Sequence, residues 1–269
     1  MLNNSSDSNI TVGIPFYAGT KIDYLSSAVD SILSQTISAQ EIHLIQDGLV
    51  SKELKELALF YEQKHNSVKH LVIQHNKGLP YALNFSIMSS STNYYARMDD
   101  DDVSHPNRLK KQLEFLETHP EIDILGTWAW EFENKPEEKH FLRKMPTEFN
   151  LIRDYIHFRN PLNHPSVMFR RSVFNKIGLY DSKFGVYCDL GMWAKAIKNN
   201  VGITNLPEPL LYYRTAGVVK RRTLGVIQQA KARFEYNTIS PKLNLLKALS
   251  LAFRLMPYSV QIWGYKNLR

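Results

Sequence analysis

"YYARMDDDDVSHPNRLKKQLEFL" (residues 94–116) places four consecutive aspartates between an apolar run and an amphipathic segment. Adjacent carboxylates repel one another, and aspartate has a low propensity for both helices and strands. This acidic run (99–102) is therefore expected in a loop between a strand and a helix. Mg²⁺ or Mn²⁺ would offset its charge, because hard divalent cations take carboxylate oxygens. A solvated acidic turn is the alternative.

Strands and helices alternate on the amino-terminal side of the acidic run. Apolar, β-rich runs predict strands at 10–16, 41–48, 68–75 and 93–98, and helical spacing predicts helices at 24–36, 52–65 and 78–90. This alternation predicts a parallel sheet with helices on both faces. Ligands of such sheets bind beyond the carboxyl ends of the strands, where Asp47, the acidic run and the "GIPFY" turn (13–17) are all expected.

Composition indicates a folded chain with an uneven charge. Of its 269 residues, 43% are hydrophobic, and Cys188 is the only cysteine, so no intrachain disulfide can form. The polar start and the lack of a run of about 18 apolar residues predict neither an export signal nor a spanning helix. The C-terminal segment (219–269) carries ten Lys/Arg and one Glu, a net +9 within a chain of net +7. It is therefore a candidate for binding anionic lipid or nucleic acid.

Several classes of function are disfavoured by missing motifs. The chain has no Walker-type phosphate loop and no G-x-G-x-x-G, which disfavours P-loop NTPases and dinucleotide oxidoreductases. A metal-dependent nucleotidyl or phosphoryl transferase is an alternative reading of the acidic run, but no second carboxylate cluster near Asp99 supports it. A nucleic-acid-binding module lacks any familiar motif, so no nucleic acid partner is expected.

Seven blocks, in this order and spacing, resemble the family 2 glycosyltransferases of bacterial O-antigen and capsular polysaccharide synthesis. They extend from about residue 10 to residue 214, and no single block would be specific. The blocks are "GIPFY", "SAVDSILSQT", "EIHLIQDG", "NKGLPYALNFSI", "YARMDDDDVSHPNRLKKQLEFL", "NPLNHPSVMFRRSVF" and "LPEPLLYYR".

The resemblance implies a GT-A fold, an α/β architecture with a mostly parallel twisted central sheet flanked by helices. This domain would occupy 1–218, with a nucleotide-binding half at about 10–105 and an acceptor half at about 106–218, followed by a basic amphipathic helical extension (219–269). The resemblance also implies a nucleotide-sugar donor (a UDP-sugar), Mn²⁺ or Mg²⁺, inversion at the anomeric carbon and a lipid-linked saccharide acceptor. The expected location is the cytoplasm, peripheral on the inner face of the plasma membrane.

The resemblance also assigns residues on the donor side. Asp99 and Asp101 match a D-x-D motif, with Asp99 toward the ribose and Asp101 toward the metal; Asp101 is preferred to Asp102 as a ligand. Asp47 matches the acid that meets the nucleotide base. The residues assigned to nucleotide-sugar binding are Pro15, Tyr17, Asp47, Gly78, Arg97, Asp99 and Arg214. Of these, Arg214 is a candidate for the diphosphate because a guanidinium is permanently cationic and fork-shaped. The family often continues Arg-x-His, and Ala216 here removes that third protein ligand to the metal.

The same resemblance assigns the catalytic base. In the family this base lies in a Glu-Asp pair before a helix that carries Leu-Trp, and in "VYCDLGMWAKAI" (186–197) the position of Trp193 makes Asp189 the base. Cys188 stands where the family usually has an acid or amide. Asp189 also suits a helix N-cap, and the two roles are compatible.

Three residues are candidates for contact with the acceptor. His164 lies in a block before the base helix, although a lone loop histidine is more often structural. Trp128 and Trp130 are two apart on a predicted strand and would share one face, where they would stack on a sugar or pack in the core.

The C-terminal segment contains an apolar helix with one polar stripe. In "LNLLKALSLAFRLM" (243–256) the stripe consists of Asn244, Lys247, Ser250 and Arg254. With the basic "KRR" (220–222), it suits an anionic membrane surface. A packed helix pair or a dimer contact is the alternative.

Overall fold

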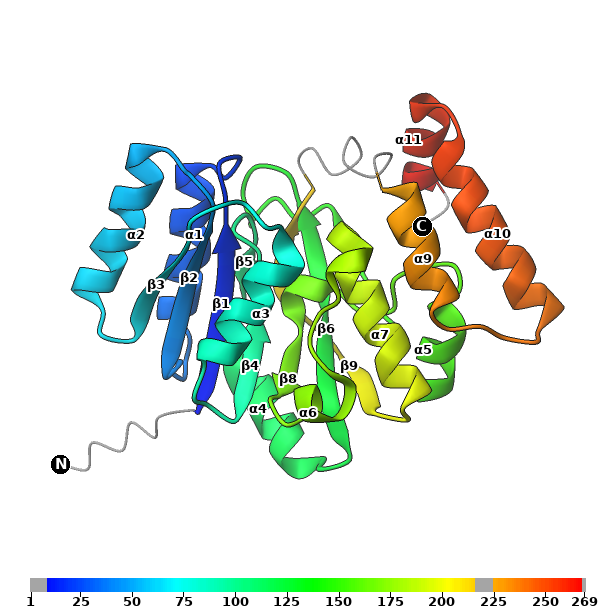
Figure 1. Ribbon diagram of the computed structural model, residues 1–269, viewed down its shortest axis with the longest axis horizontal. Coiled ribbons are helices and arrows are strands. Elements are labelled where there is room, and N and C mark those ends of the chain that lie inside the picture. Colours follow the sequence, from blue (N-terminus) through cyan, green and yellow to red (C-terminus); the bar gives the residue numbers. More distant parts are fainter. Residues whose placement is uncertain (1–8, 216–224, 268–269) are drawn as a thin grey trace.

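The structure, a computed structural model, describes residues 9–215 and 225–267. Within them a nine-stranded sheet has the strand order β3-β2-β1-β4-β8-β6-β9-β5, and β7 pairs with β6 beside this path (Figure 1). "KRR" (220–222) and Ala216 lie outside the described residues.

The amino-terminal half follows the predicted alternation. Strands β3, β2, β1 and β4 are mutually parallel, and each predicted strand and helix before the acidic run is confirmed within a few residues. The elements are β1 (Ile10–Phe16), α1 (Ile22–Leu33), β2 (Glu41–Asp47), α2 (Lys52–Lys64), β3 (Val68–Ile73), α3 (Leu79–Ser89) and β4 (Tyr94–Arg97). Residues of β1 and β2 are buried along their whole length, as expected for central parallel strands covered on both faces.

The second half extends the sheet with mixed directions. Strand β8 is antiparallel to β4 and β6, β6 is parallel to β9, and short β5 is antiparallel to β9. The strands are β5 (Val103–Ser104), β6 (Ile122–Phe132), β7 (Phe141–Arg143), β8 (Met168–Arg170) and β9 (Gly202–Arg214). The helices are α4 (Arg108–Thr118), α5 (Phe149–Tyr155), α6 (Val173–Ile177) and α7 (Cys188–Lys198), with 3₁₀ turns η1 (His164–Ser166) and η2 (Ser182–Tyr187).

Two large apolar clusters lie on opposite faces of this sheet. One joins α1, α2 and α4 to the strands, and the other joins α3, α5, α6 and α7 to them. Helices α3 and α7 cross the front of the sheet in Figure 1. The architecture is the expected α/β GT-A arrangement, and the carboxyl ends of β1, β2 and β4 meet at its upper edge in this view.

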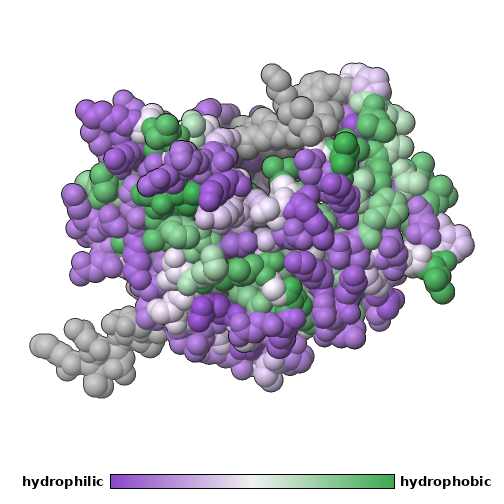
Figure 2. Space-filling model, in the orientation of Figure 1, coloured by the Kyte–Doolittle hydropathy of each residue, from purple (hydrophilic) through white to green (hydrophobic). Residues whose placement is uncertain are grey.

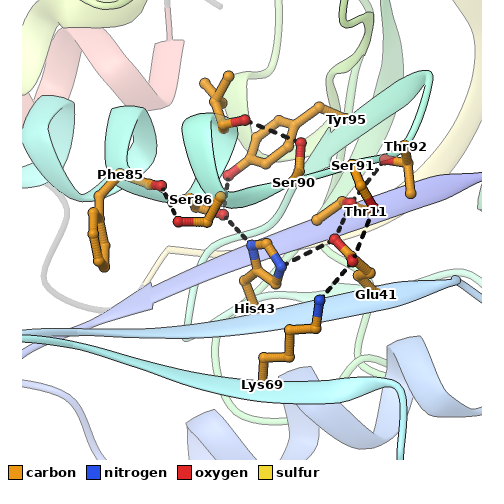
Figure 3. A network of polar contacts seen from close by, with 12 residues as sticks. Thr11, Glu41, His43, Lys69, Phe85, Ser86, Ser90, Ser91, Thr92 and Tyr95 are labelled. Carbon is orange, nitrogen blue, oxygen red and sulfur yellow. Dashed lines mark hydrogen bonds and ion pairs between the residues drawn. The ribbon is translucent and has the colours of Figure 1, made fainter.

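A buried polar network ties the amino-terminal strands to α3 (Figure 3). His43 Nδ1 lies 2.9 Å from Ser86 Oγ, which also accepts a hydrogen bond from the Tyr95 hydroxyl at 3.0 Å. Glu41 pairs with Lys69 at 2.6 Å and lies 3.2 Å from His43 Nε2. Buried polar groups are costly unless they are hydrogen-bonded, so this network favours one register of the strands.

The C-terminal helices continue the fold. Helix α9 (Val226–Phe234) packs on α7 and η2, α10 (Pro241–Leu255) packs on α9, and α11 (Tyr258–Asn267) follows. The buried Arg233 of α9 donates hydrogen bonds to the carbonyls of Ile156 and Phe158, at 2.7 and 2.9 Å. Among the described residues, no helix combines the length and apolarity needed to cross a membrane.

One residue of the polar stripe of α10, Lys247, is buried, Ser250 and Arg254 are half-buried, and Asn244 is exposed. Lys247 is 2% exposed, and its ammonium donates hydrogen bonds to the carbonyls of Arg233 and Tyr236 and to Asn237 Oδ1. The expectation that Lys247 faces an anionic surface is therefore wrong, because its donors are used inside the protein. The apolar side faces outward instead, and Figure 2 shows apolar surface over α10. The exposed apolar side chains of α10, α11 and their connection include Leu245, Leu249, Leu255, Met256 and Trp263.

Candidate active site

Three of the four aspartates converge directly after β4. Oxygens of Asp99, Asp101 and Asp102 all lie within 4.8 Å of one another. Asp102 is buried; its Oδ1 accepts a hydrogen bond from the Arg214 backbone N–H at 2.7 Å, and its Oδ2 has no hydrogen-bond partner. Burial raises the pKa of Asp102 well above its usual value, and the neighbouring Asp101 and Asp99 carboxylates raise it further. A hard divalent cation fits this set, because it would satisfy Oδ2 and offset the repulsion.

Asp100 has a different partner. The Thr20 hydroxyl donates a hydrogen bond to its carboxylate, and Thr20 Oγ1 in turn accepts the Tyr17 backbone N–H at 3.0 Å. Burial raises the pKa of Asp100 to about 6, while the Thr20 bond lowers it. The acidic run is thus tied to the turn after β1, where Pro15 is buried and Tyr17 is 39% exposed. Pro15 and Tyr17 thus lie at the carboxyl edge of the sheet, where the sequence predicted them.

Asp47 holds the loop that leads into α3. Its two carboxylate oxygens accept hydrogen bonds from the backbone N–H groups of Lys77 and Gly78, each at 2.8 Å. Gly78 has φ +83°, a conformation that strains residues with a Cβ atom. Each carboxylate oxygen retains a further lone pair, so contact with a nucleotide base stays a prediction for Asp47.

Two buried arginines flank the acidic run. Arg97 pairs with Asp99, while its Nε and Nη1 have no hydrogen-bond partner. Arg214 donates from Nε to the Asp101 carbonyl at 2.7 Å and from Nη1 to the Asn134 carbonyl at 2.9 Å. Its guanidinium also lies 3.8 Å from the ring centroid of Tyr24. Arg214 therefore braces the acidic run from behind, and its contact with a diphosphate stays a prediction.

Asp189 lies in the first turn of α7, with Cys188 buried beside it. It is not the N-cap that the sequence suggested, because the helix begins at Cys188 and its N-cap is Tyr187. Its Oδ1 accepts the Leu190 backbone N–H at 2.7 Å, and its Oδ2 accepts a hydrogen bond from the Asn160 amide. Burial raises the pKa of Asp189, whereas these two hydrogen bonds and the charge of Arg97 lower it. The negative charge of Asp99 raises the pKa of Asp189 as well, so the two carboxylates are close enough to interact electrostatically.

The three acceptor candidates are partly or wholly packed. His164 is 8% exposed, its Nε2 lies 2.9 Å from the Tyr180 hydroxyl, and its ring meets Trp193 edge to face. Burial lowers the pKa of His164 well below its usual value. Trp128 and Trp130 are half-buried on β6, where Lys144 and Lys139 lie 5.4 and 5.5 Å from their rings. Their contact with an acceptor stays a prediction.

The fold thus brings the acidic run, Arg97 and Asp189 together. The sequence favoured Asp101 over Asp102 as a metal ligand, whereas in the structure both belong to the same group of three carboxylates. It missed Thr20 and Asn160, because these residues contact Asp100 and Asp189 across 80 and 29 positions of chain. Asn160 begins one of the blocks that carry the family resemblance, but no local pattern assigns a role to it or to Thr20.

Comparison with known proteins decides the family. The model of glycosyl transferase family 2 matches residues 11–178, which is more than half of the chain. The chain belongs to this family. As a family 2 glycosyltransferase it is not a nucleotidyl or phosphoryl transferase, which was the alternative reading of the acidic run.

Relatives of this glycosyltransferase act in bacterial polysaccharide synthesis. Over 252 residues it is 29% identical to the UDP-Gal:α-D-GlcNAc-diphosphoundecaprenol β-1,3-galactosyltransferase of Escherichia coli, covering 91% of this chain and 90% of that protein. It is also 29% identical, over 268 residues, to the amylovoran biosynthesis glycosyltransferase AmsE of Erwinia amylovora, covering 96% and 98%. The expected resemblance to the O-antigen and capsular type is confirmed.

A solved structure supports the fold. The mannosyltransferase PcManGT from Pyrobaculum calidifontis, in complex with GDP-Man and Mn²⁺, superposes with a TM-score of 0.62 at 13% sequence identity. The match covers 97% of this chain and 81% of that chain. The GT-A fold expected from the sequence is therefore confirmed.

Proposed function

We propose that this family 2 glycosyltransferase is metal-dependent and inverting, and that it moves a sugar from a UDP-sugar to a lipid-linked saccharide during surface polysaccharide synthesis. The observation that carries the proposal is the convergence of Asp99, Asp101 and Asp102 beside Arg97 and Asp189 at the carboxyl edge of the sheet. The relative from Escherichia coli is named for a UDP-sugar donor and a diphospholipid acceptor, which supports the same substrate classes here.

Asp99, Asp101 and Asp102 would hold Mn²⁺ or Mg²⁺. When bound, such a cation stabilises the negative charge of a departing nucleoside diphosphate. The chain's own residues prepare this place. Thr20 and Arg214 hold the acidic run from two sides, so the carboxylates stay close together despite their repulsion. Arg97 contributes a fixed positive charge next to Asp99.

Asp189 acts as the general base. Its carboxylate takes the proton of the acceptor hydroxyl while that oxygen forms a bond to the anomeric carbon. The bond between this carbon and the diphosphate oxygen breaks on the opposite side, so one attack inverts the configuration. The raised pKa of Asp189 strengthens it as a base, because proton transfer is most efficient when the catalytic pKa lies nearer the working pH.

The outward apolar side of α10 supports a peripheral position on the inner face of the plasma membrane. Leu245 and Leu249 are 60% and 55% exposed on one side of this helix, and Leu255 and Trp263 continue the exposed surface. An amphipathic helix with such a side binds in the interface of a bilayer. A glycosyltransferase at this surface would meet a lipid-linked acceptor directly, and the cytoplasm would supply its nucleotide sugar.

A screen of nucleotide sugars tests the proposal. Purified protein is incubated with UDP-galactose, other UDP-sugars and GDP-mannose, with or without an α-GlcNAc-diphosphate lipid, in Mn²⁺, Mg²⁺ or EDTA. We expect transfer from one UDP-sugar, loss of transfer in EDTA, recovery with added Mn²⁺ or Mg²⁺, and inverted configuration in the product by NMR. Full activity in EDTA would refute the metal dependence, and a product with retained configuration would refute the inverting mechanism.

A further inference from the structure

Asn160 links the candidate base to a buried tryptophan. Its Oδ1 accepts hydrogen bonds from the Trp193 indole Nε1–H at 3.0 Å and from the Leu162 backbone N–H at 3.4 Å. Its Nδ2 donates to Asp189 Oδ2. Both groups at Oδ1 are donors only, so the amide has one orientation in which all of these contacts are hydrogen bonds.

Trp193 is a rigid support for this amide. It follows Asp189 by four residues on α7, so both side chains lie on the same face of the helix. The indole is fully buried, stacks on Phe169 at 6.0 Å between centroids, and meets His164 edge to face at 5.9 Å. A ring held on several sides presents its N–H in a fixed direction.

The backbone around Asn160 is held as well. Pro161 restricts the preceding residue to extended conformations, and the Pro161 carbonyl accepts a hydrogen bond from Asn205 at 3.1 Å. Upstream, the two carbonyls bound by Arg233 anchor the chain to α9. The amide is therefore fixed through both its side chain and its backbone.

We propose that Asn160 is the positioning residue for the Asp189 carboxylate, and that Trp193 sets the orientation of Asn160. The inference rests on the proposed role of Asp189 as the base. Rotation of a carboxylate about its last torsion is otherwise soft. The Asn160 hydrogen bond holds Oδ2, the Leu190 N–H holds Oδ1, and the remaining lone pairs point in a defined direction for the acceptor proton.

Kinetics of two variants test this arrangement, with the donor and acceptor of highest turnover in the screen above; UDP-galactose and the α-GlcNAc-diphosphate lipid are its first pair. For Asn160→Ala we expect kcat to fall by about 10–100-fold, the scale of a small misplacement of a catalytic group, with the donor KM unchanged. Trp193→Phe keeps an aromatic side chain but removes the pyrrole half of the indole with its N–H, and it leaves the Asn160 amide in place, so we expect a smaller fall in kcat. Asn199→Ala is the matched control, because Asn199 is exposed at the other end of α7 and its side chain donates to the Lys195 carbonyl, away from Asp189.

A pH profile separates positioning from general stability. The charged or titratable groups that interact with the Asp189 carboxylate include Arg97, Asp99, Tyr180 and Cys188. All four are retained in the variants. Loss of a hydrogen bond to the ionised form raises a carboxyl pKa, so the acid limb of kcat should move to higher pH in Asn160→Ala. If Asn160→Ala is unstable, Asn160→Ser, which also lacks the amide that donates to Asp189, gives the same comparison.

The outcomes distinguish this inference from the function on which it rests. Wild-type kcat and an unmoved acid limb in Asn160→Ala, with Asp189→Asn inactive, would overturn the positioning role alone. A fall in melting temperature with wild-type kcat per folded molecule would overturn it too. Active Asp189→Asn would show that the base itself is misassigned. A kcat loss with unchanged donor KM and a shifted acid limb supports the proposal.

Discussion

At the scale of single residues, the acidic run divides into two kinds of aspartate. Asp99, Asp101 and Asp102 face one another, whereas Asp100 turns to Thr20. The buried Oδ2 of Asp102 lacks a hydrogen bond, and leaving such an atom unsatisfied costs about 1–3 kcal/mol. A cation bound to Asp102 Oδ2 would remove this cost. The metal role explains the run better than a solvated turn does, because Asp102 is not solvated.

Asp102→Asn should separate metal binding from folding. It removes a buried charge that lies against two like charges, so we expect the metal-free protein to melt at a higher temperature than the wild type. We also expect the Mn²⁺ concentration for half-maximal transfer to rise by at least about 10–100-fold, which is the cost of losing a group that only hydrogen-bonds a metal ligand. Melting curves and Mn²⁺ titrations of transfer measure both effects.

Asp100→Asn is the matched control for this change. It keeps the size of the side chain and a hydrogen bond with Thr20, so we expect a weaker effect on the Mn²⁺ titration. An Mn²⁺ dependence of Asp102→Asn equal to that of the wild type would remove Asp102 from the metal site.

The sequence predicted Asp99, Asp101 and Asp189 because each stands next to a recognisable local pattern. It did not reveal Asn160 or Thr20, whose roles depend on contacts made only after the chain folds. It assigned Arg214 to the diphosphate, and that contact stays a prediction. The side chain is directed to backbone carbonyls behind the acidic run, and that geometry depends on β9 lying beside β6.

At the scale of elements, periodicity predicted the parallel strands well because they are buried on both faces. It was less informative for the C-terminal helices. The spacing of polar residues on α10 predicted a stripe, but spacing alone cannot tell which side of a helix faces the protein. Lys247 faces inward because the end of α9 and the residues after it offer three acceptors for its N–H donors: the carbonyls of Arg233 and Tyr236 and the side-chain oxygen of Asn237.

The contact between α9 and the segment after α5 predicts a pH dependence of stability. Burial, aided by Lys247 and Arg233, lowers the pKa of His157 to about 4, so this side chain is neutral in the folded protein. An unfolded histidine has a pKa of about 6.5 and binds a proton first as the pH falls. The unfolded state therefore holds more protons between these values. The contribution of His157 to the free energy of unfolding should be complete above about pH 6.5 and should be lost progressively as the pH falls toward 4.

Denaturant unfolding at several pH values checks this expectation. We expect His157→Gln to show a shallower decline of the unfolding free energy than the wild type over this range, whatever its stability at neutral pH. His75→Gln, at an exposed position, should keep the wild-type slope. An unchanged slope in His157→Gln would contradict the account of this contact.

At the scale of the whole molecule, the candidate site and the C-terminal helices with their exposed apolar side chains are parts of one unit. Helix α9 packs on α7, which carries Asp189, and α10 packs on α9. In Figure 1 the upper edge of the sheet lies between α2 at one end and α10 at the other. A protein resting on a bilayer through α10 would keep a constant distance between the site and the membrane surface.

Removing two leucines from this surface should release the protein from lipid. Each leucine contributes up to about 1.5–3 kcal/mol when fully buried, so partial burial of two predicts roughly 10–100-fold weaker binding for Leu245→Ser/Leu249→Ser. Sedimentation with anionic liposomes measures this. Phe60→Ser, an exposed apolar position on α2, should bind like the wild type. A wild-type protein that does not sediment with such liposomes would contradict the membrane assignment.

The most direct measurement for the central claim is the transfer rate of Asp189→Asn set against its affinity for the nucleotide sugar. The amide keeps the size of the side chain but cannot take a proton, and a positioned general base contributes about 10²–10⁴-fold. We expect transfer to fall by this factor while donor affinity and melting temperature stay close to wild type. Cys188→Ala should lose much less. Near wild-type transfer by Asp189→Asn, or an inactive Cys188→Ala, would contradict the account and place the base elsewhere.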